Sequence, residues 1–329
     1  MTHFSKKNPT RRAVLKMGLA AGGLLMGTGW SPTRVCGASS PSRVTLARTQ
    51  NLTARKAKTA DLLPMLDRGI EALYGGSARD VWEALIRPDD VVGLKVNGLA
   101  GRGMSTRPAL VQALIRRIQG AGVPPHRIII WDRLCADLKR AGYPLNTEGT
   151  EVRSYGNDVS GYDRQLTINR SIGSLLARTL TDRCSVIINV PVLKDHGICG
   201  VTLAMKNHFG AIHNPNKYHM HTGDPYIADL NELPVIRNKT VLTVADALTA
   251  QCEGGPPFMP QWTWHYGGLL LATDPVAMDT VGWQILEEER TRRGLPTLEE
   301  DGRKPTYIRT AANLGLGIDD LDRIEVVTV

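Results

Sequence analysis

Cysteine is scarce in this chain, and its spacing excludes several kinds of metal centre. The sequence has five cysteines, and no two of them form a Cys-x-x-Cys pair. Ferredoxin-like iron–sulfur clusters and zinc ribbons need such pairs, so no intrinsic iron–sulfur cluster motif is present. Cys199 and Cys252 lie in glycine-rich segments, and in an oxidising compartment they are candidates for a disulfide. Their spacing alone leaves open whether they pair.

Motifs of the common nucleotide and hydrolase sites are also missing. The sequence has no P-loop, no G-x-G-x-x-G fingerprint between a strand and a helix, and no nucleophile elbow. P-loop nucleotide hydrolysis, dinucleotide binding of the usual kind and serine-hydrolase chemistry therefore have no support.

Acidic residues are absent from the first 38 positions, which instead carry an export address. Thr10-Arg11-Arg12-Ala13-Val14-Leu15-Lys16 precedes a weakly apolar run from Met17 to Trp30. This order is typical of a twin-arginine signal peptide, so we expect residues 1–38 to be one and the protein to be periplasmic. The apolar run has 14 residues, whereas a membrane span needs about 20. We expect the twin-arginine export machinery as a partner and no stable span after cleavage; an uncleaved anchor is the alternative.

The excess of positive charge belongs to this address. The whole chain has 40 basic and 32 acidic residues, a net charge of +8. Six of the basic residues lie within residues 1–38, which leaves 34 against 32 in the remainder. A nearly neutral mature chain gives no electrostatic case for binding nucleic acid.

Strand-like and helix-like patterns alternate through residues 39–329. We expect strands at 44–47, 90–96, 127–131, 185–190, 240–245, 268–272 and 324–327, and helices at 60–73, 78–85, 108–121, 170–180, 201–209, 225–235, 275–290 and 307–314. Alternation with Val- and Ile-rich strands predicts an α/β fold with a mostly parallel, Rossmann-like layered sheet and helices on both faces. We expect residues 39–329 to form a single α/β domain.

Polar side chains follow the predicted strand at 90–96. Lys95 and Asn97 are spaced to point to the same side of a strand, and Ser105 comes just before the helix that Pro108 opens. Lys95 and Asn97 suit an anion anchor, or Lys95 pairs with a structural carboxylate. The hydroxyl of Ser105 suits an oxyanion or an ordinary helix cap.

A second group follows the strand at 185–190. Lys194 and His196 are two residues apart, so in an extended segment their side chains point to the same side. Lys206 and Asn207 come shortly afterwards. Lysines hold anions and histidine transfers protons near neutral pH, although the same residues in a polar loop would simply be solvated. We therefore predict three catalytic residues, His196, Lys194 and Lys206, and four substrate-binding residues, Lys95, Asn97, Ser105 and Asn207.

Six of the eight histidines lie between positions 196 and 265. Such density can build a site for zinc, iron or another transition metal, although no H-E-x-x-H spacing is present. With acids at a predicted strand end and in a glycine-rich loop, the predicted metal ligands are Asp246, Glu253, His208 and His213. The alternative is that these histidines are surface or hydrogen-bonded residues.

Taken together, these segments resemble the domain of unknown function 362 family. The resemblance rests on six motifs in this order: Gly93 to Asn97, Ser105 to Pro108, Ile188 to His196, Gly200 to Gly210, Val244 to Asp246 with Glu253-Gly254, and Thr273 to Asp279. The chain is similar to an exported member of this family with a twin-arginine signal. It lacks the appended ferredoxin cysteine motifs that some members carry. The resemblance implies an α/β domain and a shared polar site, without specifying a reaction.

The leading hypothesis is an enzyme that acts on a small anionic substrate, a carboxylate or phosphate, at a Lys/His/Asn site. A divalent or transition metal would be the cofactor if one assists. Two alternatives stay open: a non-catalytic periplasmic protein that binds an anion or metal, and an accessory factor for a redox complex. For the last, Trp262, Trp264 and Tyr266 are the local hint.

Overall fold

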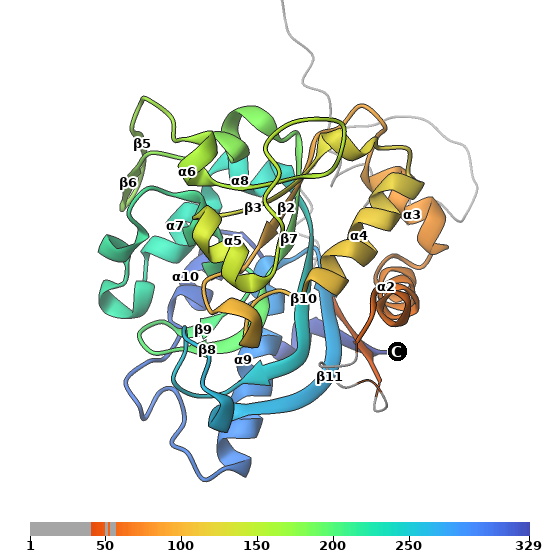
Figure 1. Ribbon diagram of the computed structural model, residues 1–329. Helices are drawn as coiled ribbons and strands as arrows, with labels where there is room; N and C mark the ends of the chain where they lie inside the picture. The colour runs from red at the N-terminus through yellow and green to blue at the C-terminus, as the bar shows by residue number, and fades with distance from the viewer. Residues whose placement is uncertain (1–40, 50–51, 53–56) are drawn as a thin grey trace, which may run out of the picture.

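The computed structural model describes residues 41–49, 52 and 57–329 (Figure 1). The predicted signal peptide lies outside the described residues, so its export route and its cleavage stay predictions. Within the described part of the chain, no helix is both long and apolar enough to cross a membrane.

A ten-stranded mixed sheet organises the described chain. Its order is β12 (Ile324–Thr328), β1 (Ser42–Arg48), β11 (Thr263–Ala272), β10 (Thr240–Gln251), β7 (Val186–Val190), β2 (Val92–Val96), β3 (Ile128–Asp132) and β4 (Arg153–Gly156). β8 (Val192–His196) pairs with β10, and β9 (Gly200–Thr202) pairs with β8. Only β1–β11, β10–β11 and β8–β9 pair antiparallel among these described strands, which confirms a mostly parallel sheet.

The strand order has a switch point between β2 and β7. From β2 the sheet continues to β3 and β4 on one side, and from β7 it continues to β10 on the other. Ligands of open α/β sheets bind beyond the carboxyl ends of the strands at such a point. Lys95 on β2 and Asn189 on β7 are direct neighbours there.

Alternate residues of the central strands pack into separate cores on the two faces. Leu94 and Ile130 join one core with α2 (Thr59–Tyr74), α3 (Ala78–Leu85) and α4 (Pro108–Gly120). Ile129 and Trp131 join another with α7 (Tyr226–Glu232), α8 (Pro234–Lys239) and α10 (Tyr307–Asn313). Figure 1 shows these groups of helices on opposite sides of the sheet, which confirms the expected layers.

The remaining elements are a long helix and several short ones. α9 (Pro275–Arg292) packs its apolar residues with those of β10 and β11. The others are α5 (Cys135–Ala141), α6 (Asn157–Ser160), and the hairpin of β5 (Thr167–Asn169) and β6 (Ile172–Ser174).

Two predicted helices are wrong. Residues 170–180 contain β6 and the start of a π-helical turn at Thr179–Arg183. Residues 201–209 begin as β9 and continue into the 3-10 segment η4 (Lys206–Ala211). Thr202 of β9 pairs with Lys194 of β8, eight residues earlier, so a short antiparallel hairpin replaces the expected helical bonds. Helix propensity is a weak preference that strand pairing overrides.

The cysteines that could have formed a disulfide do not pair. Cys199 and Cys252 are both buried free thiols, and Cys252 Sγ lies 3.4 Å from the carbonyl oxygen of Trp262. Cys184 is buried in an apolar core, as its apolar neighbours in the sequence suggest.

Candidate functional site

A buried polar network occupies the switch point, and Lys95 lies at its centre. The Lys95 ammonium lies 2.7 Å from Asp132 Oδ1, 2.7 Å from the Val96 carbonyl oxygen and 3.4 Å from Asn207 Oδ1. These three acceptors use its three N–H groups. The side chain is 1% exposed. Lys95 therefore matches the structural alternative, a lysine paired with a carboxylate, better than a free anion anchor.

Asn207 joins the strands of this network. Its Nδ2 donates to Asn189 Oδ1 at 2.7 Å and to the Lys95 carbonyl at 3.1 Å, and its Oδ1 accepts from Asn97 Nδ2 at 3.3 Å. Asn97 in turn accepts from Lys194 Nζ at 3.3 Å. The structure thus brings four predicted site residues, Lys95, Asn97, Lys194 and Asn207, into one hydrogen-bonded group.

Lys194 is a buried cation held by neutral acceptors. Besides Asn97, its ammonium donates to the carbonyl oxygens of Met104 at 3.3 Å and Pro256 at 3.1 Å. Burial lowers the pKa of Lys194 to about 8, against smaller opposing effects of Asp195 and Asp132. Next to Met104, Ser105 is buried, and its Oγ has no hydrogen-bond partner among the described residues.

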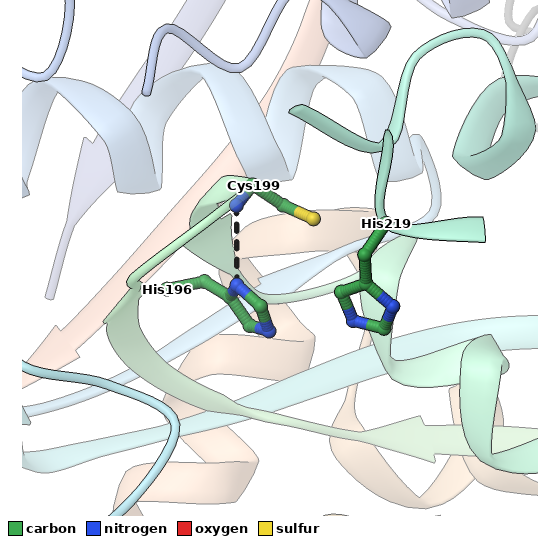
Figure 2. Close-up of side chains that lie close together, drawn as sticks. All are labelled: His196, Cys199 and His219. Carbon is green, nitrogen blue, oxygen red and sulfur yellow. Dashed lines mark hydrogen bonds between the residues drawn. The ribbon is translucent and has the colours of Figure 1, made fainter. Parts of the chain in front are cut away.

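A second group lies between the β8–β9 turn and the segment before η6 (Met220–Gly223). It consists of His196, Cys199, Lys206 and His219. The rings of His196 and His219 stack with their centroids 5.2 Å apart, and the thiol of Cys199 lies close to both (Figure 2). Lys206 Nζ lies 3.0 Å from His219 Nε2 and 4.1 Å from the centroid of the Phe209 ring.

The hydrogen bonds assign a tautomer to each ring. His196 Nδ1 accepts from the backbone N–H groups of Ile198 and Cys199, both at 3.1 Å, so a neutral His196 carries its proton on Nε2. His219 Nδ1 lies 3.1 Å from the Pro215 carbonyl oxygen, so it donates there and its Nε2 accepts from Lys206. The lone pairs of His196 Nδ1 and His219 Nε2 therefore both accept hydrogen bonds.

Burial keeps both imidazoles neutral. It lowers the pKa of His196 to about 2, with Lys206 as the next cause, and the pKa of His219 to about 4, again with Lys206 next. Burial also lowers the pKa of Lys206 to about 8, which the nearby Cys199 opposes. Of these three groups, Lys206 has the pKa nearest neutrality, so it is best suited to proton transfer.

These residues are the group that could hold a metal. The ligand atoms of His196, Cys199 and His219 all lie within 4.8 Å of one another, the one such set found in the described residues. Soft metals such as zinc accept imidazole and thiolate ligands. However, burial raises the pKa of the Cys199 thiol, and both ring lone pairs accept hydrogen bonds. A metal would have to displace these bonds, so the arrangement fits a hydrogen-bonded cluster better than a preformed metal site.

The predicted metal ligands do not gather into one set in the described structure. Asp246 pairs with Arg107, and Glu253 pairs with Arg290 and Arg303. His208 contacts Asn231, and the ring of His213 packs edge-on against Tyr162. Each carboxylate is neutralised by an arginine, because the fold places a guanidinium beside it.

Sequence reasoning missed Cys199 and His219 as members of the cluster. The spacing His196-x-x-Cys199 was a local signal for the thiol. His219 is 13 residues from Lys206, and no local pattern relates them. Only the fold of the segment that contains both shows that they touch.

An open hollow of about 730 Å³ lies in front of this cluster. His219 and Arg303 line it, and Arg303 also binds Asp195, Glu253 and Asp301. Two large apolar side chains on its lining are exposed, Ile198 at 50% and Met220 at 63%. His219 therefore contacts both the hollow and the buried ammonium of Lys206.

The family model for DUF362, a domain of unknown function, matches residues 92–284. The chain belongs to this family. The match runs from β2 into α9 and includes the polar network and the His196–Lys206 cluster. Membership in the DUF362 family agrees with the resemblance found in the sequence motifs.

Other comparisons add little about function. No curated protein matches the sequence. A Thermotoga maritima protein solved as a structural genomics target is similar at 10% sequence identity, with a TM-score of 0.43. The alignment covers 74% of this chain and 61% of that protein.

Proposed function

We propose that this DUF362 protein is an enzyme that acts on a small organic anion, a carboxylate or phosphate, bound beside Lys206. The observation that carries the proposal is the bonding of this lysine. Its ammonium has three N–H groups, and His219 Nε2 is the one hydrogen-bond acceptor found for it in the described structure. No carboxylate of the described residues forms an ion pair with it, although its side chain is buried. A buried cation without a counter-ion favours an anionic ligand.

The tautomers support the same ligand. A neutral His196 presents Nε2–H as a donor, so it can add a hydrogen bond to an anion without carrying charge. With a pKa of about 2, His196 is a weak base, and we therefore assign proton transfer to Lys206, whose pKa is about 8. Lys95, Asn97, Lys194 and Asn207 would position this segment from behind rather than touch the substrate.

The hollow suggests an organic anion in preference to an inorganic one. It is a wide hollow of about 730 Å³ that is open to solvent, so an organic anion can reach it. Exposed Ile198 and Met220 offer apolar contacts, while Glu253 and Asp301, held by Arg303, favour the anionic end of a ligand being turned toward Lys206. Entry to Lys206 requires His219 to move or to take part in the contact.

A metal centre is the second candidate, favoured by the proximity of His196, Cys199 and His219. It would use the thiolate of Cys199 and release the hydrogen bonds now made by both rings. A non-catalytic binding protein would use either arrangement without turnover. Export through the twin-arginine route, with function in the periplasm, belongs to the same proposal and rests on residues 1–38.

Calorimetric titration of residues 39–329 with phosphate, acetate, benzoate and phenyl phosphate tests the anion site. We expect binding that is abolished in Lys206→Met and retained in Lys304→Met, a control at an exposed lysine that pairs with Glu299. Elemental analysis of the same samples tests the metal. Equal binding in both variants would contradict the anion site, and a stoichiometric metal lost in Cys199→Ala would favour the second candidate.

A turnover assay on the anions that bind separates an enzyme from a binding protein. Product formation with a rate that falls as pH rises through about 8 would support Lys206 as the proton-donating group, because the same ammonium holds the anion and both roles end when it loses its proton. Tight binding without product for every anion that binds would favour a solute-binding role.

A further inference from the structure

A second, much smaller cavity lies beside His208 of η4. Its volume is about 30 Å³, and its walls include His208, Asn231, Arg237, Thr240, Leu242 and Leu316. These residues come from η4, α7, α8 and β10, and Leu316 from the segment after α10. No role in the proposed function involves this cavity.

The hydrogen bonds of Asn231 determine the state of His208. Asn231 Nδ2 donates to the carbonyl oxygens of Met205 at 3.0 Å and Ile227 at 2.8 Å, which identifies its other atom as the oxygen. That oxygen lies 2.7 Å from His208 Nδ1, so Nδ1 carries a proton and donates. A neutral His208 then has its lone pair on Nε2, and burial lowers its pKa to about 4.

Two residues that line this cavity each have a buried polar atom without a partner in the described structure. His208 Nε2 and Thr240 Oγ1 are both buried and have no hydrogen-bond partner among the described residues. The His208 side chain is 2% exposed. Buried polar atoms are nearly always hydrogen-bonded, by protein or by ordered water, because an unmade bond costs the folded state free energy.

We propose that one water molecule binds in this cavity and bridges His208 Nε2 to Thr240 Oγ1. The volume of about 30 Å³ admits one water, which needs at least about 10–15 Å³. The ligand must donate to the lone pair of Nε2, which excludes an anion. The guanidinium of Arg237 on the wall disfavours a cation. In this proposal His208 binds water, and the sequence-based prediction of His208 as a metal ligand is the alternative.

The bridge would complete a chain from Thr240 on β10 through His208 on η4 to Asn231 on α7. This chain of hydrogen bonds would fix η4 through His208. η4 also carries Lys206 and Asn207, so the water would help to hold both in place. His208 is a positioning residue in this account.

A high-resolution crystal structure of residues 39–329 tests the water directly. We expect one density peak of water-like height within about 3.2 Å of both atoms. Thr240→Val should lose or displace this peak, whereas Thr249→Val should keep it, since Thr249 is on the same strand but does not line the cavity. No peak at a resolution where other waters are visible would overturn the proposal. A peak at about 2.0–2.1 Å from Nε2 would indicate a metal instead.

Nitrogen-15 NMR of the histidine rings gives a second measurement, first on the wild-type protein and then on Thr240→Val. We expect His208 as the Nδ1–H tautomer, with Nε2 shifted as a hydrogen-bond acceptor and unprotonated down to about pH 5. In Thr240→Val the Nε2 resonance should move toward that of an unbonded acceptor. An Nε2–H tautomer would overturn the proposal, because that nitrogen would then be a donor.

Discussion

Replacing Lys206 by methionine should stabilise the protein at pH 7 while removing anion binding. Burial lowers the pKa of Lys206 from 10.5 to about 8, so the charged form is disfavoured in the folded state by about 3 kcal/mol. Methionine avoids this cost but loses the hydrogen bond to His219 Nε2, a loss of about 1 kcal/mol. We therefore expect the free energy of unfolding to rise by about 1–2 kcal/mol.

The pH dependence of this gain has a definite sign. The folded protein releases the Lys206 proton near pH 8, while the unfolded chain keeps it to about 10.5. Between these values the unfolded state binds more protons, so wild-type stability gains from Lys206 as pH rises. The advantage of Lys206→Met should be full below pH 8, and it should shrink and then reverse as pH approaches 10.5.

Urea unfolding of both proteins at pH 7 and pH 10 measures this difference, with Lys95→Met as the matched control. Lys95 pairs with the buried carboxylate of Asp132 at 2.7 Å, so its loss leaves an unpaired charge and should cost about 3–5 kcal/mol. Opposite signs for the two variants at pH 7 would support the assignment of Lys206 as an unpaired cation. If Lys206→Met were as destabilising as Lys95→Met, Lys206 would have a counter-ion and the reasoning would be refuted.

Three further predictions concern residues around the site. Burial raises the pKa of Asp279 to about 7, so the folded protein should lose stability as pH rises from about 4 to 7 and the buried carboxyl is forced to ionise. In Asp279→Asn the free energy of unfolding, measured with urea, should depend less on pH in this range. Gly210→Ala would place a Cβ 2.7 Å from both Asp132 Oδ1 and Lys95 Nζ, and its melting temperature should fall by several degrees, or the steric argument is wrong. Thiol titration of residues 39–329 should find four free thiols after unfolding, with Cys135 reacting first in the native protein because it is the least buried, and fewer than four would indicate a disulfide.

Three predicted helices show which parts of the secondary structure the local sequence pattern can predict. The helix at 78–85 has the predicted bounds, because Ser77 caps it and its apolar residues keep helical spacing. The predicted helix at 225–235 divides into α7 and α8 at Pro234, which cannot supply the backbone N–H that a continuous helix needs. Residues 201–209 were mispredicted because β9 forms a short antiparallel hairpin with β8, which the helical spacing of these residues does not reveal.

The candidate site divides in the same way. Sequence spacing identified Lys194, His196, Lys206 and Asn207 as residues of interest, and the strand-end position of Lys95 and Asn97 was readable from the pattern of apolar residues. The sequence did not predict which of these lysines pairs with a carboxylate. Asp132 is 37 residues from Lys95, and nothing in the sequence sets Lys95 apart from Lys206 in this respect.

The sequence by itself determined the α/β class, the mostly parallel sheet and the family, because these depend on the order of apolar runs and on short motifs. Only the tertiary structure decided that Asp246 and Glu253 are neutralised by arginines and that His219 and Cys199 meet His196. It also decided that Lys206 is buried with no carboxylate partner among the described residues. Charge pairing and desolvation depend on distances between segments far apart in the chain. Those distances exist only once the sheet and its connections have folded.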